Sequence, residues 1–222
     1  MAGPTLFLKE DQMDTKEILE RIQNNNKRTL VKIYIQGKLD QVTFGPDVRV
    51  IRMGEGGMVF GDWEVLQPIL ANYSSVIEDY VVEGDRRNST IDLLDIKNVD
   101  ARVEPGAIIR EGVTIEKDAV IMMGACINIG ARIGEKALID MNAVIGGRAS
   151  IGKRCHVGAG VVIKGVISSP HASPVTIEDD VIIGPNAVIM EGIHIGTGAI
   201  IGAGCIVTKD VQAGEVIHSP IY

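Results

Sequence analysis

Branched aliphatic residues recur at every sixth position through the second half of the chain. Every position in this series is Ile or Val, and a second series four residues later holds only Ala, Cys, Val or Ile. Between the two series stand Gly, Asn, Asp and charged residues, which suit turns or solvent. The first series comprises Val103, Ile109, Ile115, Ile121, Ile127, Ile133, Ile139, Ile145, Ile151, Val157, Ile163, Ile177, Ile183, Ile189, Ile195, Ile201 and Val207.

This spacing predicts a stack of short β-strands. Alternation on a strand puts residues i and i+4 on one face, whereas at about 100° per residue a step of six scatters side chains around an α-helix. One six-residue piece cannot bury its own apolar face, so successive pieces must stack and pair their backbones at about 4.8 Å. We therefore expect a parallel β-helix over residues 103–212, with a column of Ile inside.

The series is interrupted once. After Ile163 the next member is due at residue 169 but stands at Ile177, so eight residues are inserted. Pro and Ser interrupt strands, and we expect a loop at residues 168–175. It is either a tolerated surface insertion or a functional loop, since loops on rigid scaffolds often carry function.

The N-terminal region lacks the six-residue period. Residues 1–85 predict a small α/β domain, residues 86–102 a linker, and residues 213–222 a short C-terminal tail. Within the small domain, capping and alternation predict a helix at 15–25, strands at 30–35, 42–44, 48–53 and 58–60, and a helix at 63–80 interrupted near Pro68.

Composition narrows the classes of function. A net charge of −7 gives no reason to expect nucleic acid as a partner. Cys126, Cys155 and Cys205 show no CxxC spacing, and their places in the repeat indicate burial rather than a nucleophile. No apolar run is typical of a signal peptide or a membrane span, so we expect a cytoplasmic protein with no membrane partner.

A β-helix filled with Ile has no internal pocket, so a site must lie on its surface, at the loop or between copies. Residues 141–177 contain no Asp or Glu but include Arg148, Lys153, Arg154 and Lys164. We expect these bases to form a patch that attracts an anion. The alternative is that they are solvated surface residues.

Asp140 and His156 are candidates for acid–base chemistry. His156 follows Asp140 by almost one coil, so both can occupy one corner of the stack as a base and its orienting partner. The alternatives are a turn-capping Asp and a surface His. The four histidines show no metal-ligand spacing, so no metal is expected.

Several runs carry a resemblance to a known family. They are residues 85–89 (DRRNS), 102–110, 139–148 (with Asp-Met-Asn and Gly-Gly-Arg), 155–160 and 178–184. In these runs, and from about residue 30 to 210, the chain resembles the tetrahydrodipicolinate N-acetyltransferases of the hexapeptide-repeat acyltransferase family. The resemblance implies a left-handed parallel β-helix with three hexads per turn and five to six turns. It also implies a homotrimer that binds acetyl-CoA between neighbouring β-helices.

The implied activity is transfer of an acetyl group from acetyl-CoA to the nitrogen of the dicarboxylate (S)-2,3,4,5-tetrahydrodipicolinate, in lysine and diaminopimelate biosynthesis. Asp140 matches an Asp of the related succinyltransferases, whereas Ala187 stands where they have a Glu. The chain also ends without the Gly-x-Pro-Ala turn and basic helix usual in the family.

Site roles follow as expectations. Asp140 and His156 are expected to be catalytic, and backbone N–H groups near residues 158–160 to stabilise the oxyanion. We expect substrate binding by Asn142, Arg148 and Arg154, and cofactor binding by Gly158, Gly160, Lys164, Ser168, Ser169 and Ala203. The alternatives are another hexapeptide acetyltransferase, with an amino sugar or serine as acceptor, and a non-catalytic β-helix that serves assembly.

Overall fold

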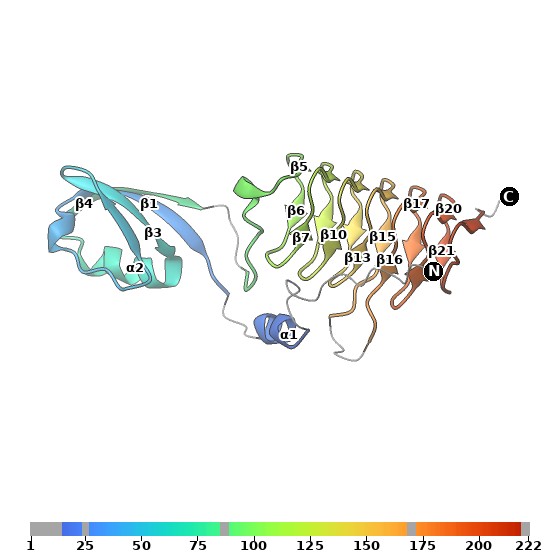
Figure 1. Cartoon of the computed structure of the whole chain (residues 1–222). Helices are drawn as coiled ribbons and strands as arrows, with labels where there is room; N and C mark the ends of the chain where they lie inside the picture. The colour runs from blue at the N-terminus through green and yellow to red at the C-terminus, as the bar shows by residue number, and fades with distance from the viewer. Residues whose placement is uncertain (1–14, 24–26, 85–88, 168–171, 219–222) are drawn as a thin grey trace. The chain divides into compact units, whose positions relative to one another are not determined.

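The computed structural model describes residues 15–23, 27–84, 89–167 and 172–218 (Figure 1). The chain divides into two compact units: residues 24–90 form one, and residues 1–23 together with 91–222 form the other. We call them the small unit and the β-helix unit and describe each by itself. None of the helices in the described ranges has the length and apolar character needed to cross a membrane.

The small unit is a four-stranded antiparallel sheet with one α-helix packed on it. The strand order is β2-β3-β1-β4. Ile33 and Val59 face Leu66 of the helix, and all three are fully or almost fully buried. Its elements are β1 (Leu30–Gly37), the 3-10 helix η1 (Leu39–Gln41), β2 (Arg49–Arg52), β3 (Gly56–Asp62), α2 (Trp63–Asn72) and β4 (Ile77–Gly84).

Two expectations for the small unit are wrong. Residues 42–44 are not a strand, because the Val42 N–H donates to Leu39 O to close the η1 turn while the Val42 side chain enters the core. The second helix ends at Asn72 rather than near residue 80. The β-branched residues of β4 pair with β1 instead, and β-branched residues pack well on a sheet.

The β-helix unit confirms the expected fold class: three parallel sheets form its sides. The five-stranded sheet contains β7 (Thr114–Ile115), β10 (Arg132–Ile133), β13 (Ser150–Ile151), β16 (Thr176–Ile177) and β19 (His194–Ile195). The six-stranded sheet contains β6 (Ile108–Ile109), β9 (Cys126–Ile127), β12 (Val144–Ile145), β15 (Val162–Ile163), β18 (Val188–Ile189) and β21 (Ile206–Val207). The seven-stranded sheet contains β5 (Arg102–Val103), β8 (Val120–Ile121), β11 (Leu138–Ile139), β14 (His156–Val157), β17 (Ile182–Ile183), β20 (Ile200–Ile201) and β22 (Val216–Ile217).

The pairing register fixes the length of one turn of the β-helix. Ile139 pairs with Val157, which stands three steps further along the six-residue series, so three hexads make a turn. Val157 pairs in turn with Ile183, again three members further along the series, although the inserted segment lies between them. The insertion therefore leaves the stack after β15 and returns to it without disturbing the register of the coils.

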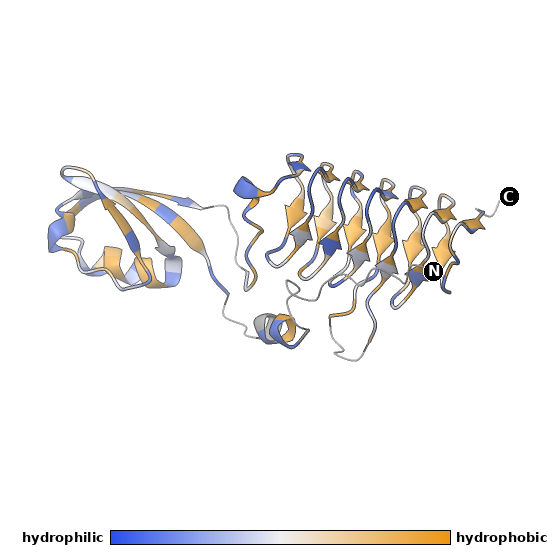
Figure 2. Ribbon diagram, in the orientation of Figure 1, coloured by the Kyte–Doolittle hydropathy of each residue, from blue (hydrophilic) through white to orange (hydrophobic). Residues whose placement is uncertain are grey.

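The inside of the β-helix is a column of Ile closed by small residues. Ile121, Ile139 and Ile145 have no exposed surface, and Ala143 and the other central Ala residues of the second series are at most 1% exposed. Figure 2 shows this repeated apolar band along the strands. The Ile side chains fill most of the interior, so the second series has room only for small side chains such as Ala.

Most turns between strands use the same backbone conformation at their third residue. That residue has a positive φ, as in Asn142 (φ 57°), Arg154 (φ 56°) and Gly160 (φ 68°). Its N–H donates to a carbonyl of the preceding coil, such as Met141 O for Gly160. The need for this left-handed conformation explains why Gly, Asn and Asp recur here.

Helix α1 (Thr15–Gln23) belongs to the β-helix unit. Its Ile18 is fully buried in a cluster with Ile91 and Ile129, and Ile167 packs against them. The short 3-10 helix η2 (Ile96–Asn98) precedes β5. This unit therefore has a second, small apolar cluster outside the main column.

The cysteines differ in their expected reactivity. Cys155 is buried and its Sγ contacts Glu178 O at 2.9 Å, and burial raises the pKa of its thiol to about 11. Because the thiolate is the nucleophile, we expect a small alkylating reagent at pH 8 to modify the half-buried Cys126 before Cys155 or Cys205. Mass spectrometry of the digested protein would measure the order. Earlier modification of Cys155 in the native protein would contradict it.

Candidate functional site

The turns of the β-helix form three corners, which separate the expected site residues. The Asp140 corner (residues 122–125, 140–143, 158–161, 184–187 and 202–205) follows the seven-stranded sheet. The Lys164 corner (residues 128–131, 146–149 and 164–167) follows the six-stranded sheet. The Arg154 corner (residues 116–119, 134–137, 152–155 and 178–181) follows the five-stranded sheet.

Asp140 and His156 lie side by side, as the sequence predicts. Strand β11 pairs with β14, and the Asp140 N–H donates to Val157 O. His156 Nε2 is 3.8 Å from Asp140 Oδ2, an ion-pair distance rather than a hydrogen bond. About half of the His156 side chain is exposed, so its ring can reach a ligand. Whether the two residues are catalytic stays a prediction.

The backbone fixes the direction of the Asp140 carboxylate. The Met141 N–H donates to Asp140 Oδ1 at 2.7 Å, which leaves Oδ2 on the side of His156. A carboxylate held in this way can orient an imidazole and stabilise its protonated form. His156 itself stands on the outer face of the seven-stranded sheet between Leu138 and Ile182, so its neighbours there are apolar.

Four further predicted residues share this corner. Asn142 directs its carboxamide over the preceding coil, where a Cβ added to Gly124 would collide with Asn142 Oδ1. Gly160 is covered in the same way, by Asn186 Oδ1. Gly158 is packed against the Ile183 carbonyl, and Ala203 lies at the same corner further along. Contact of these residues with a ligand stays a prediction.

The expectation of oxyanion donors near residues 158–160 is wrong for Gly158 and Gly160 and stays a prediction for Ala159. The Gly158 N–H donates to Ile183 O at 2.8 Å, and the Gly160 N–H donates to Met141 O at 2.9 Å. Both groups therefore hold the coils together and are not free for a ligand. Ala159, between them at the tip of the turn, shows no hydrogen bond from its N–H to any described residue.

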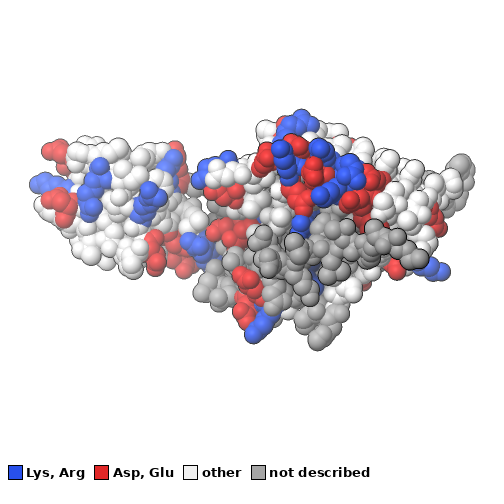
Figure 3. All heavy atoms as spheres, in the orientation of Figure 1, with Lys and Arg blue, Asp and Glu red and all other residues white. Residues whose placement is uncertain are grey.

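The expected acid-free patch is also wrong, because the neighbouring coils supply acids. Arg154 Nε lies 2.7 Å from Asp180 Oδ1, and Arg154 Nη2 donates to Asp180 Oδ2 at 2.7 Å. This pairing holds the pKa of Asp180 below its ordinary value. On the face shown in Figure 3, acidic and basic side chains of the β-helix intermingle. The other pairs are Lys153–Glu135 (3.5 Å) and Lys164–Glu191 (2.6 Å).

The substrate and cofactor residues expected elsewhere are dispersed. Arg154 lies at its own corner, bound to Asp180, so a substrate carboxylate would have to displace that partner. Arg148 and Lys164 lie at the Lys164 corner, where Arg148 Nη1 donates to Val166 O at 3.3 Å. Ser168 and Ser169 lie outside the described residues.

The sequence reasoning missed a second histidine–carboxylate cluster. His194 Nε2 is 3.0 Å from Glu178 Oε1, and Thr197 Oγ1 donates to Glu178 Oε2 at 2.6 Å. The Thr197 contacts, followed by His194, hold the pKa of Glu178 below its ordinary value. The sequence could have indicated this pair, since Glu178 and His194 lie about one turn of the stack apart, as Asp140 and His156 do.

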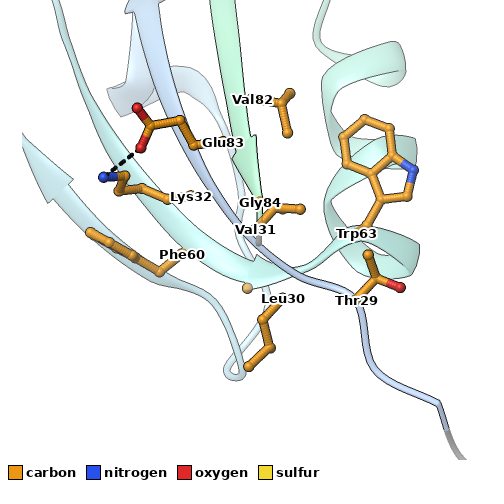
Figure 4. Close-up of a pocket in the computed structure, with 10 residues that line it drawn as sticks. Thr29, Leu30, Val31, Lys32, Phe60, Trp63, Val82, Glu83 and Gly84 are labelled. Atoms are coloured by element: carbon orange, nitrogen blue, oxygen red, sulfur yellow. Dashed lines mark ion pairs between the residues drawn. The ribbon is translucent and has the colours of Figure 1, made fainter. Parts of the chain in front are cut away.

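The small unit carries a hollow at the end of β1 and β4, open to solvent. Lys32 Nζ and Glu83 Oε2 form an ion pair of 2.7 Å at its side, and Trp63 stands across from them (Figure 4). Of the residues that line it, only these two are charged. Within the described ranges, no group of three or more His, Cys, Asp or Glu side chains is placed to hold a metal ion.

Comparisons with known proteins match both units. A family described as tetrahydrodipicolinate succinyltransferase N-terminal matches residues 13–96. The bacterial transferase hexapeptide family (six repeats) matches residues 130–165 and 174–209. The hexapeptide repeat of succinyl-transferase matches residues 112–147.

Similar proteins span nearly the whole chain. A 2,3,4,5-tetrahydropyridine-2,6-dicarboxylate N-acetyltransferase of Brevibacillus brevis is 56% identical over 207 residues, covering 93% of this chain and 88% of the relative. One of Shouchella clausii is 58% identical over 205 residues, covering 92% and 85%. A solved structure, PerB from Caulobacter crescentus in complex with CoA and GDP-perosamine, is 24% identical, with 55% of each chain covered and a TM-score of 0.49. A similarity as low as this last one does not bear on function.

Proposed function

The chain belongs to the 2,3,4,5-tetrahydropyridine-2,6-dicarboxylate N-acetyltransferases, and from this premise we propose that it transfers an acetyl group from acetyl-CoA to the nitrogen of (S)-2,3,4,5-tetrahydrodipicolinate. The observation that carries the proposal is the identity of 56% and 58% to two proteins of that name, over 93% and 92% of the chain. The step belongs to diaminopimelate and lysine biosynthesis. The donor is a co-substrate, and no metal takes part in the proposed chemistry.

The proposed mechanism is direct transfer with Asp140 and His156 at the reacting atoms. A tetrahydropyridine ring contains a C=N bond, so its nitrogen has no proton to lose until water has added across that bond. His156 then accepts the proton as the nitrogen attacks the thioester carbonyl, and Asp140 stabilises the imidazolium. The imidazolium returns the proton to the departing CoA thiolate. In this proposal the Ala159 N–H, at the same corner, donates to the developing oxyanion.

We propose that the protein acts as a homotrimer in which copies meet beside the Asp140 corner. The two sheets that flank this corner carry apolar residues on their outer faces, including Ile182 (47% exposed), Ile200 (40%) and Ile206 (68%). The five-stranded sheet instead presents Thr114, Arg132, Ser150, Thr176 and His194. Exposed apolar area on two adjacent sides favours burial against other copies. Cytoplasmic location belongs to the same proposal.

A thiol-release assay tests the proposed activity. We expect acetyl-CoA with tetrahydrodipicolinate to release free CoA, and succinyl-CoA, serine or an amino sugar to release it at least about tenfold more slowly. Light scattering on the same preparation should give the mass of three chains. Faster release with serine or an amino sugar would favour the other acetyltransferases. An intact trimer that neither releases thiol nor binds acetyl-CoA in calorimetry would favour a non-catalytic assembly protein.

A further inference from the structure

The inserted segment begins at an unusual turn. After β15 the Lys164 N–H still donates to Ile189 O at 2.9 Å, as a regular coil requires. Val166 then stands where most other turns have their positive-φ residue, but Val166 is not among the residues with positive φ. Residues 165–167, which we call the loop root, therefore depart from the backbone conformation of the regular turn.

The Gly-Gly-Arg run, residues 146–148, contacts the loop root. A Cβ on Gly146 would collide with the Gly165 nitrogen, and a Cβ on Gly147 would lie 2.5 Å from Ile167 Cγ1. The Val166 N–H keeps the bond of a regular turn, to Gly147 O at 3.2 Å, and Arg148 Nη1 adds a second bond, to Val166 O at 3.3 Å. Because the two glycines have no side chain, the loop root can lie close to their backbone, and the Arg148 side chain holds the loop root by its hydrogen bond to Val166 O.

Helix α1 closes the other side of the loop root. Ile129 is a turn residue with no exposed surface, whereas Met123 and Met141, at the equivalent turn position, are 44% and 42% exposed. Ile18 covers Ile129, and Ile167 packs against the same cluster. Gly130 leaves the space, because a Cβ there would lie 2.6 Å from Ile18 Cδ1.

We propose that Ile18, Gly147 and Arg148 are positioning residues that fix the course of the loop root and thereby the placement of Lys164 for acyl-donor binding. Lys164 immediately precedes the loop root, and its side chain is 44% exposed but paired with Glu191 at 2.6 Å. A phosphate of the donor would have to displace Glu191 from the ammonium, so the placement of Lys164 matters for donor binding. Truncation of Ile18 removes part of the apolar cluster against which Ile167 packs, so the loop root becomes more mobile. The inference rests on the proposed function only in assigning Lys164 to acetyl-CoA.

The test compares Ile18→Ala with Leu19→Ala, a control on the same helix outside the cluster. We expect Ile18→Ala to raise the KM for acetyl-CoA by about fivefold, with kcat and the KM for the acceptor unchanged. Hydrogen exchange without ligand should be faster in peptides covering residues 164–167 and unchanged at residues 140–143. Leu19→Ala should match the wild type in both. Gly147→Ala, which pushes on Ile167 from the other side, should repeat the Ile18→Ala result.

Unchanged exchange at residues 164–167 in a folded Ile18→Ala protein would overturn the proposal. So would a fall in kcat or an equal rise in both KM values, since these indicate a general structural role. If the wild type acetylates no acceptor, the proposed function fails, whereas the exchange measurement still decides whether Ile18 and Gly147 hold the loop root.

Discussion

A His156→Gln variant is expected to transfer acetyl groups about 100-fold more slowly than the wild type, or slower still, with an unchanged fold and assembly. Gln keeps a polar side chain on the outer face of the seven-stranded sheet but cannot accept the proton from the attacking nitrogen. Asp140→Asn should lower kcat by at least about tenfold, because the imidazolium then loses its charged partner. Steady-state kinetics with light scattering measures both effects.

The chain offers a matched control in its other histidine–carboxylate pair. His194 also faces outward and lies 3.0 Å from Glu178 Oε1, closer than His156 lies to Asp140. His194→Gln should leave kcat within about twofold of the wild type if proximity to a carboxylate alone does not make a base. Near-normal turnover of His156→Gln would remove His156 from the chemistry. The double variant with Asp140→Asn should be little slower than His156→Gln alone, because the two residues act as one unit.

Replacing Ile139 with Ala should cost about 3 kcal/mol of unfolding free energy. Ile139 is completely buried in the column directly before Asp140, and truncation leaves a cavity that the stacked coils cannot easily collapse. Ile96→Ala removes the same atoms from a side chain that is 46% exposed, and should change stability by less than about 0.5 kcal/mol. Urea unfolding of both variants measures the difference. Equal losses would contradict the burial of Ile139 in a tightly packed column.

The repeat made most of the β-helix predictable from the sequence. Each hexad contributes the same short strand, so the inward positions of Ile139 or Ala143 follow from counting alone. The closeness of Asp140 and His156 follows from the same count. The elements of the small unit were harder to predict because its sequence has no repeat. Val42 lies in the core without belonging to a strand, and Val81 pairs in β4 rather than extending a helix.

Other features of the site depend on what stacks beside each residue. The stretch 141–177 contains no acid that could pair with its basic residues, but Asp180, which follows the insertion, lies one coil away from Arg154 and pairs with it. Likewise, the sequence does not show that the Gly158 N–H is used, because its acceptor, the Ile183 carbonyl, lies on the next coil. Because the insertion lengthens one coil, residues that pair across that coil are further apart in the sequence than residues that pair across a regular coil.

The burial of Ile18 sets an order of events for a chain that grows on the ribosome. Its partner Ile129 is synthesised only after the whole small unit and the first coil of the stack, and Ile167 later still. Of the cluster partners of Ile18, only Ile91 precedes the stack, so the cluster cannot close until two coils exist. Residues 24–90 have their own core and can fold in the meantime, since domains fold as units during synthesis. Helix α1 is thus expected to reach its buried position only after the small unit and two coils have been synthesised.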